Sequence, residues 1–193
     1  MYFIGDGWVD FGLAAGFLSY GLCKSDNRAL QTSSQIVESI LASGFVVQVI
    51  KHVTGRENPY TATAPTGKWR FFPNQFDYAN NVAKYDAMPS GHLAAGMATL
   101  TVIGENYPER KWIRPLGYTL LGILSFQMLN NGVHWASDYP LAVAFGYSFG
   151  RIAVNRGRTP LKKTSKNSAP NRIAVGPAVV GGAPGLKATF RFP

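Results

Sequence analysis

The chain has 193 residues, 46% apolar and only 15% charged, enough for one domain with a core and poorer in charge than an average soluble domain. The low charge content favours a membrane-embedded or membrane-adjacent protein. The net charge of +9 lies entirely in residues 151–193, which contain no acidic residue. A neutral body argues against a nucleic-acid partner, and a single cysteine, Cys23, excludes an internal disulfide.

Five helices are expected in chain order, from apolar patterning and from start and stop residues. They cover residues 8–23, 27–53, 90–106, 110–129 and 137–155. The stretch 40–50 is apolar nearly all round, which predicts burial on every side. Residues 56–88 read as a long loop, which is typical of a functional cover. We therefore expect an all-α helical bundle.

The C-terminal part differs in composition from this helical body. Residues 156–171 are polar and basic, which indicates a linker. Residues 172–193 have strand-like composition, with apolar and polar side chains alternating from Leu186 to Phe192 and a turn-forming GGAPG before them. The expected organisation is a helical domain over 1–155, a linker over 156–171 and a hairpin-like tail over 172–193, whose partner the sequence does not name.

The sequence Pro89-Ser90-Gly91-His92 begins the third expected helix. Ser90 is a good N-cap, and the open amides of a helix N-terminus bind anions. A histidine in the first turn can protonate a leaving oxygen. The alternative is an ordinary capped helix with a packed histidine, and the motif alone does not decide between the two.

The sequence His134-Trp-Ala-Ser-Asp138 carries a second histidine. If this segment is helical, the four-residue spacing places both side chains on one face. The carboxylate would then fix the imidazole tautomer and make the other ring nitrogen a better nucleophile or base. Taken alone, a capping Asp138 above a packed His134 is the simpler interpretation. Lys51, at the end of the second helix, is either an anion ligand or a lysine reaching for solvent.

In this order and spacing, Lys51 with Pro59, the Pro-Ser-Gly-His motif and His134 with Asp138 together resemble the type-2 phosphatidic acid phosphatase and vanadium-dependent haloperoxidase superfamily. The resemblance covers about residues 45–155. It implies that His134 attacks phosphorus and becomes phospho-histidine, that Asp138 orients it and that His92 is the general acid. Lys51, Ser90 and the Gly91 amide would bind the phosphate oxygens.

The same resemblance implies an all-α bundle of the acid phosphatase type, with no metal and no cofactor. Vanadate would bind only as a phosphate mimic. The substrate would be a phosphomonoester or a lipid phosphate or pyrophosphate. Membrane contact and a place in the membrane or on the periplasmic side of the cell envelope are also expected.

Two positions depart from the superfamily pattern. Asn58 and Met128 stand where the pattern has arginines that clamp phosphate. If each lost contact weakens transition-state binding by about 2–3 kcal/mol, activity falls roughly a hundredfold or more. Asn58 can still donate one neutral hydrogen bond, and Arg56 is the nearest replacement in sequence. The alternative is a weakly active or non-catalytic homologue that serves as a binding or structural module of the envelope.

Overall fold

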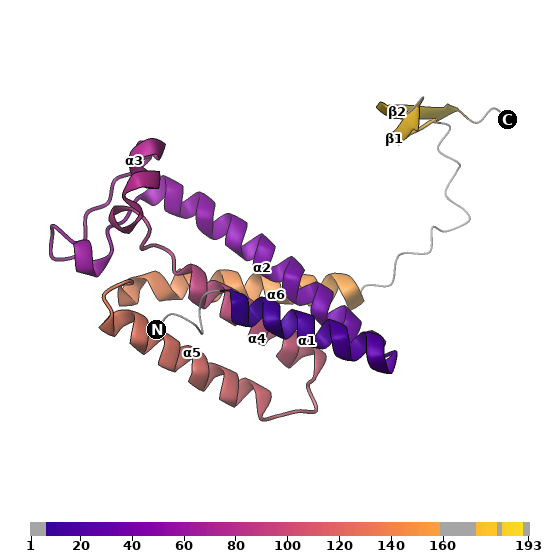
Figure 1. The fold of residues 1–193 in the computed structure, drawn as a ribbon, viewed down its shortest axis with the longest axis horizontal. Helices are drawn as coiled ribbons and strands as arrows, with labels where there is room; N and C mark the ends of the chain where they lie inside the picture. The colour runs from indigo at the N-terminus through magenta and orange to yellow at the C-terminus, as the bar shows by residue number, and fades with distance from the viewer. Residues whose placement is uncertain (1–6, 159–172, 181–182, 191–193) are drawn as a thin grey trace. The chain divides into compact units, whose positions relative to one another are not determined.

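The computed structural model describes residues 7–158, 173–180 and 183–190, with side chains for 7–157. The described residues fall into two compact units, 7–158 and the two strand segments 173–180 and 183–190. The first unit is a helical bundle, which confirms the all-α prediction (Figure 1). Its long helices are α1 (Trp8–Lys24), α2 (Asn27–Thr54), α4 (Gly91–Asn106), α5 (Ile113–Asn130) and α6 (Tyr139–Arg158). Shorter elements are α3 (Gln75–Asn80), η1 (Pro59–Thr61), η2 (Val82–Lys84) and η3 (Ala136–Asp138).

Local capping groups set the ends of α2. The Asp26 carboxylate accepts hydrogen bonds from the backbone N–H groups of Arg28 and Ala29, at 2.9 and 3.1 Å. At the other end, Gly55 adopts the left-handed conformation with φ of 52° and donates its N–H to Lys51 O at 3.0 Å. These groups satisfy backbone atoms that a helix end leaves unpaired. The helix therefore stops one turn after Lys51.

The core lies where α4 packs against α6 and α2. A β-carbon on Gly146 of α6 would come within 2.3 Å of Ala94 O on α4, so only glycine allows this approach of the two backbones. Two buried apolar clusters flank the contact. One comprises Val47, Leu93, Ala94, Leu124, Met128 and Ala142, and the other Ala14, Ile36, Ile40, Val102 and Val154. The first cluster lies directly under the N-terminus of α4.

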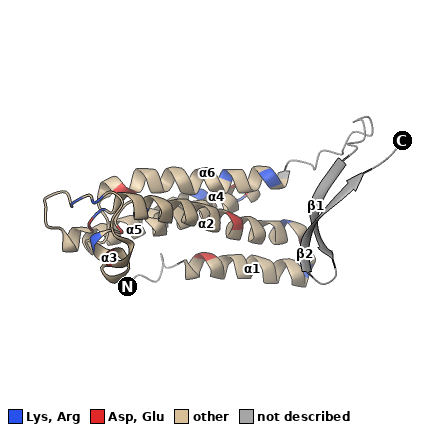
Figure 2. Cartoon of the chain, turned by 90° about the horizontal axis from the view of Figure 1, so that it is seen from above, with Lys and Arg blue, Asp and Glu red and all other residues tan. Residues whose placement is uncertain are grey.

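The prediction that residues 40–50 are buried on every side is wrong. Leu41, Phe45 and Val49, one turn apart on the same face of α2, are 60%, 71% and 48% exposed. No helix of the described bundle covers this face, although α1, α4 and α6 cover the others. Among the described helices, α2 alone is long and apolar enough to cross a membrane. Figure 2 shows long uncharged stretches of helix, with charges mainly near helix ends and in the loop after α2.

Glu57 fastens this loop, which runs from residue 55 to 90. Its carboxylate is fully buried and accepts hydrogen bonds from the backbone N–H groups of Thr63 and Lys68, at 3.1 and 2.9 Å. Arg70 Nη2 completes the set at 2.7 Å. Burial raises the pKa of the carboxyl, but these bonds outweigh burial and hold the pKa at about 2. Glu57 is therefore an ionised anchor at neutral pH.

In the second unit, β1 (Ile173–Val180) pairs antiparallel with β2 (Ala183–Phe190), so that Ile173 lies opposite Phe190. The prediction of a linker from residue 156 is corrected at its start, because α6 continues to Arg158. The rest of that linker lies outside the described residues.

Candidate active site

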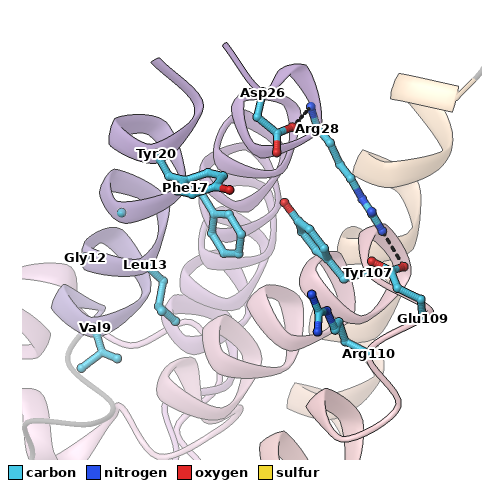
Figure 3. Close-up of a pocket in the computed structure, with 11 residues that line it drawn as sticks. Val9, Gly12, Leu13, Phe17, Tyr20, Asp26, Arg28, Tyr107, Glu109 and Arg110 are labelled. Atoms are coloured by element: carbon cyan, nitrogen blue, oxygen red, sulfur yellow. Dashed lines mark hydrogen bonds and ion pairs between the residues drawn. The ribbon is translucent and has the colours of Figure 1, made fainter. Parts of the chain in front are cut away.

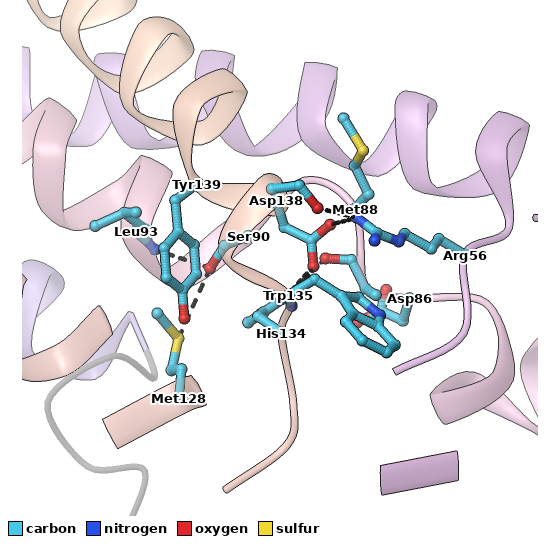
Figure 4. Close-up of polar contacts among 12 residues, drawn as sticks. Arg56, Asp86, Met88, Ser90, Leu93, Met128, His134, Trp135, Asp138 and Tyr139 are labelled. Carbon is cyan, nitrogen blue, oxygen red and sulfur yellow. Dashed lines mark hydrogen bonds and ion pairs between the residues drawn. The ribbon is translucent and has the colours of Figure 1, made fainter. Parts of the chain in front are cut away.

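The N-terminus of α4 is the centre of the candidate site (Figure 4). Ser90 is its N-cap, and its hydroxyl oxygen accepts from Leu93 N at 3.4 Å. The Ser90 N–H points to Asp138 O at 3.4 Å, which joins the start of α4 to the turn before α6. Lys51 reaches the same place from α2, since a β-carbon on Gly91 would lie 3.9 Å from Lys51 Nζ. A buried ammonium therefore lies beside a helix N-terminus, a combination that attracts anions.

His134 and His92 face each other beside this helix start. Their ring centroids are 6.3 Å apart and the rings are nearly perpendicular, at 71°. His134 is only 4% exposed, and its Nδ1 lies 2.7 Å from the carbonyl oxygen of Ala87. A carbonyl oxygen only accepts, so Nδ1 carries the proton. The neutral ring therefore keeps its free lone pair on Nε2.

Asp138 does not hold His134 in the way its spacing suggested. The segment is not α-helical, because His134 precedes η3, and α6 begins only at Tyr139. The Asp138 carboxylate instead closes this short turn by accepting from Trp135 N at 2.7 Å. Its distance to His134 Nδ1 is 3.7 Å, beyond a hydrogen bond. Asp138 therefore lies near His134 without bonding to it, while the Ala87 carbonyl sets the tautomer.

Arg56 is the direct partner of Asp138. Its Nη1 pairs with Asp138 Oδ1 and also donates to Ser137 Oγ at 2.8 Å. Its guanidinium lies 4.8 Å from the ring centre of Trp69 and 5.2 Å from that of Trp135. The side chains of Arg56 and Asp138 are 5% and 0% exposed. These contacts direct the guanidinium of Arg56 toward Asp138. They do not test the predicted contact of Arg56 with phosphate.

The two positions that lack arginine are both buried. Asn58 is 9% exposed, and its Oδ1 has no hydrogen-bond partner within the described part of the chain. Met128 is 2% exposed and belongs to the apolar cluster under α4. Its sulfur lies 3.7 Å from Ser90 Oγ. A thioether therefore occupies the place beside the helix N-terminus where the superfamily pattern has a guanidinium.

Three further residues complete the site and were missed from sequence. Asp86 accepts from Lys51 Nζ at 2.8 Å and from the Tyr78 hydroxyl at 2.7 Å, so it fixes the ammonium. Ala87 contributes only its carbonyl, for which no sequence signal exists. Tyr139 packs edge-on to His134, with centroids 6.4 Å apart, and burial with the nearby Asp138 charge raises its pKa to about 12. Of these three residues, only Asp86 carries a signal in the sequence, because it is an acidic residue shortly before the Pro-Ser-Gly-His motif.

A family model described as the PAP2 superfamily matches residues 33–160. The chain belongs to the PAP2 superfamily. This match confirms the resemblance drawn from Lys51, the Pro-Ser-Gly-His motif and His134, and it ends before the two strands. No curated protein and no solved structure matches the chain. PAP2 proteins are typically phosphatases, so a hydrolase is supported at that level.

Proposed function

We propose that this PAP2 protein is a metal-independent phosphatase that works through a phospho-histidine at His134. The observation that carries the proposal is the hydrogen bond from His134 Nδ1 to the Ala87 carbonyl. It leaves the Nε2 lone pair for phosphorus, next to a helix N-terminus and a lysine. A nucleophile with a fixed tautomer beside a ready anion site is what phosphoryl transfer requires.

The reaction has two steps. In the first, His134 Nε2 forms a bond to phosphorus as the phosphorus–oxygen bond to the leaving group breaks, and His92 gives a proton to that oxygen. In the second, water attacks phosphorus, the phosphorus–nitrogen bond breaks and His92 takes a proton from the water. Inorganic phosphate leaves, and both histidines return to their starting protonation states.

Lys51, the Ser90 hydroxyl and the Gly91 amide are proposed to hold the phosphate oxygens. The ammonium supplies charge, and the helix start supplies N–H donors and a favourable dipole. Asn58 offers at most one neutral donor from its side-chain amide. Arg56 supports the site by holding Asp138, and we propose no direct phosphate contact beyond that. The expected activity is therefore modest for this superfamily.

A lipid phosphate or pyrophosphate is the favoured substrate class, with other phosphomonoesters as the alternative. The exposed apolar face of α2, with Leu41, Phe45 and Val49, supports membrane contact. PAP2 proteins are often membrane-associated. We propose that the protein works in the membrane or on the outer side of the cell envelope, where a lipid substrate would reach His134.

A second function is favoured by Met128. A buried thioether beside the anion site binds no phosphate oxygen, and the Asp138 carboxylate is paired with Arg56 instead of hydrogen-bonded to His134. Both features suit a weakly active or non-catalytic homologue that keeps the bundle as a binding or structural module of the envelope.

A hydrolysis assay separates the two functions. Purified full-length protein is given p-nitrophenyl phosphate or phosphatidic acid, and released phosphate is measured across pH. The enzyme proposal expects turnover that His134→Ala abolishes and Arg156→Met leaves intact. Arg156 is a suitable control because it lies near the end of α6 in an exposed pair with Glu38, away from the histidines.

A labelled phosphate group should also appear on the wild-type protein, stable in alkali and lost in acid, and it should be absent from His134→Ala. Failure of every substrate to turn over at any pH would favour the binding module. Equal activity of His134→Ala and wild type would refute the phospho-histidine.

A further inference from the structure

A hollow of about 470 Å³ lies between α1, α4 and α5, away from the histidines. It is lined mostly by apolar side chains, among them Leu13, Leu100, Leu116 and Leu120. Ligand sites for small molecules have volumes of this order and are largely apolar with a few polar groups. Thr99, in its wall, follows Ser90 by nine residues on α4, or about 13 Å along the helix axis. The hollow is therefore distinct from the candidate active site.

Two buried polar side chains, Asp10 and Thr99, interrupt this apolar wall, which also carries the hydroxyl of Tyr107 and the indole N–H of Trp112. Asp10 is 6% exposed and has no ion-pair partner among residues 7–157. Thr99 is 3% exposed, and its hydroxyl has no hydrogen-bond partner within the described structure. Buried hydroxyl groups are normally hydrogen-bonded. Among the described residues, the Thr99 hydroxyl has only the neighbouring Asp10 carboxyl to interact with, by a contact outside ordinary hydrogen-bond geometry, so both groups can still take a partner from the cavity.

The two groups are close to each other. Burial raises the pKa of the Asp10 carboxyl, and the nearby Thr99 hydroxyl partly opposes that rise. A carboxyl with a raised pKa is more readily protonated, and a protonated carboxyl both donates and accepts hydrogen bonds. One small polar group could therefore bond to Asp10 and Thr99 together, with the rest of its molecule in the apolar hollow.

A second hollow continues from the first, because Val9, Leu13, Phe17 and Tyr107 line both. It measures about 710 Å³ and is shown in Figure 3. Its polar end carries Arg28 and Glu109, which pair at 2.7 Å. Arg110 also lines this end, so a further cation is present there, whereas the residues that line the first hollow include none. The second hollow lengthens the apolar space beside α1 that could hold an alkyl chain.

We propose that the hollow between α1, α4 and α5 binds an uncharged long-chain alcohol, with its hydroxyl between Asp10 and Thr99 and its alkyl chain along the leucines of α5. The chemical class follows from the wall of this hollow. Asp10 and Thr99 are its buried polar pair, Tyr107 and Trp112 add two further hydrogen-bonding groups, and no lining residue is a cation that would bind a phosphate. This site does not depend on catalysis at His134. The source of the alcohol is either a free long-chain alcohol or a neutral membrane lipid that carries a hydroxyl group.

Photo-crosslinking tests the proposal on the full-length protein in phosphatidylcholine vesicles. The probe is 1-dodecanol with a photoreactive diazirine in its chain, and labelled peptides are identified by mass spectrometry. Competitors are 1-dodecanol, dodecane and a diacylglycerol. We expect labels on α1 and α5 at the hollow. 1-Dodecanol should compete roughly tenfold better than dodecane, because dodecane leaves the buried polar pair without a partner.

Thr99→Val keeps the shape and removes the hydroxyl, so it should abolish the preference for the alcohol over the alkane. Thr99→Ser should keep the preference. Thr119→Val is the matched control, since Thr119 is exposed on α5 and bonds to Pro115 O at 2.9 Å. Competition by diacylglycerol at or below the dodecanol concentration would identify a membrane lipid as the source, and weaker competition would identify a free alcohol.

Equal competition by dodecanol and dodecane, labels outside the hollow, or an unchanged preference in Thr99→Val would each overturn the proposal. If Thr99→Val loses labelling altogether, Thr99→Ser shows whether the missing hydroxyl is the cause. If Thr99→Ser labels as wild type does, the hydroxyl is required. If both variants lose labelling while circular dichroism shows intact helices, the polar recognition by Thr99 is refuted.

Discussion

Replacement of Arg56 by methionine tests whether the pair with Asp138 is as deeply buried as the structure has it. The two side chains are 5% and 0% exposed. Removal of one partner from a buried pair leaves an uncompensated charge, which costs about 3–5 kcal/mol. Loss of the guanidinium between Trp69 and Trp135 adds roughly 0.5–1 kcal/mol. We expect Arg56→Met to lower the free energy of unfolding by about 4 kcal/mol.

A double-mutant cycle isolates the pair. Asp138→Asn keeps an acceptor for Trp135 N–H but removes the charge, so Arg56→Met with Asp138→Asn should cost less than the sum of the single changes. The expected coupling is about 2–3 kcal/mol. The assay is urea-induced unfolding in mild detergent, followed by circular dichroism.

An exposed pair provides the matched control. Arg156 and Glu38 are 73% and 42% exposed, so Arg156→Met should cost about 0.5 kcal/mol or less. The reasoning is refuted if Arg56→Met costs no more than Arg156→Met, or if the changes at Arg56 and Asp138 simply add. Either result would mean that water screens the pair and that Asp138 is free to bond to His134.

Two further predictions concern the loop anchor and the missing arginine. Glu57 titrates at about 2 when folded and at 4.5 ordinarily, so its stabilisation is present above pH 4.5 and is lost as the pH falls toward 2. Glu57→Gln should therefore lower stability by about 2 kcal/mol at pH 7, and the difference from wild type should shrink in acid; a difference independent of pH would contradict this. Met128→Arg should lower the melting temperature in buffer, because it buries a cation, and vanadate should raise that temperature more than it does for wild type. An equal vanadate shift in both proteins would show that residue 128 does not face the anion site.

Local signals in the sequence predicted the helices well. Thr54-Gly55 ended α2 and Ser90 began α4 at the expected residues because a cap acts on atoms a few positions away. The face of α2 that carries Phe45 was not predictable in the same way. Apolar composition shows that a side chain avoids water, but it does not show whether a protein helix or a lipid chain covers it.

The candidate site was predicted as a set of residues but not as a set of bonds. Lys51, Ser90, Gly91 and His92 do meet, since a helix end and its capping motif carry their geometry locally. The partner of His134 is a backbone carbonyl 47 residues earlier, for which the sequence has no marker. Trp135, directly after His134, has an extended backbone, and α6 begins only at Tyr139, so the four-residue spacing to Asp138 does not place both side chains on one helix face.

Arg56 illustrates the same limit at longer range. Its position beside Asn58 suggested a substitute phosphate ligand, and only the fold shows that it reaches Asp138, 82 residues away. Contacts of this kind depend on how the loop after α2 packs against the turn before α6, which no short motif encodes.

The close approach at Gly146 has a consequence for the distance between the two histidines. His92 lies in the first turn of α4 and His134 just before α6, so the spacing of these helices sets the gap in which a phosphate would lie. That spacing is limited by main-chain atoms, because nothing but hydrogen stands between Gly146 and Ala94 O. The width of the gap is thus fixed by direct contact between two backbones. A single methyl group added at Gly146 would widen the gap without altering any residue that touches the substrate.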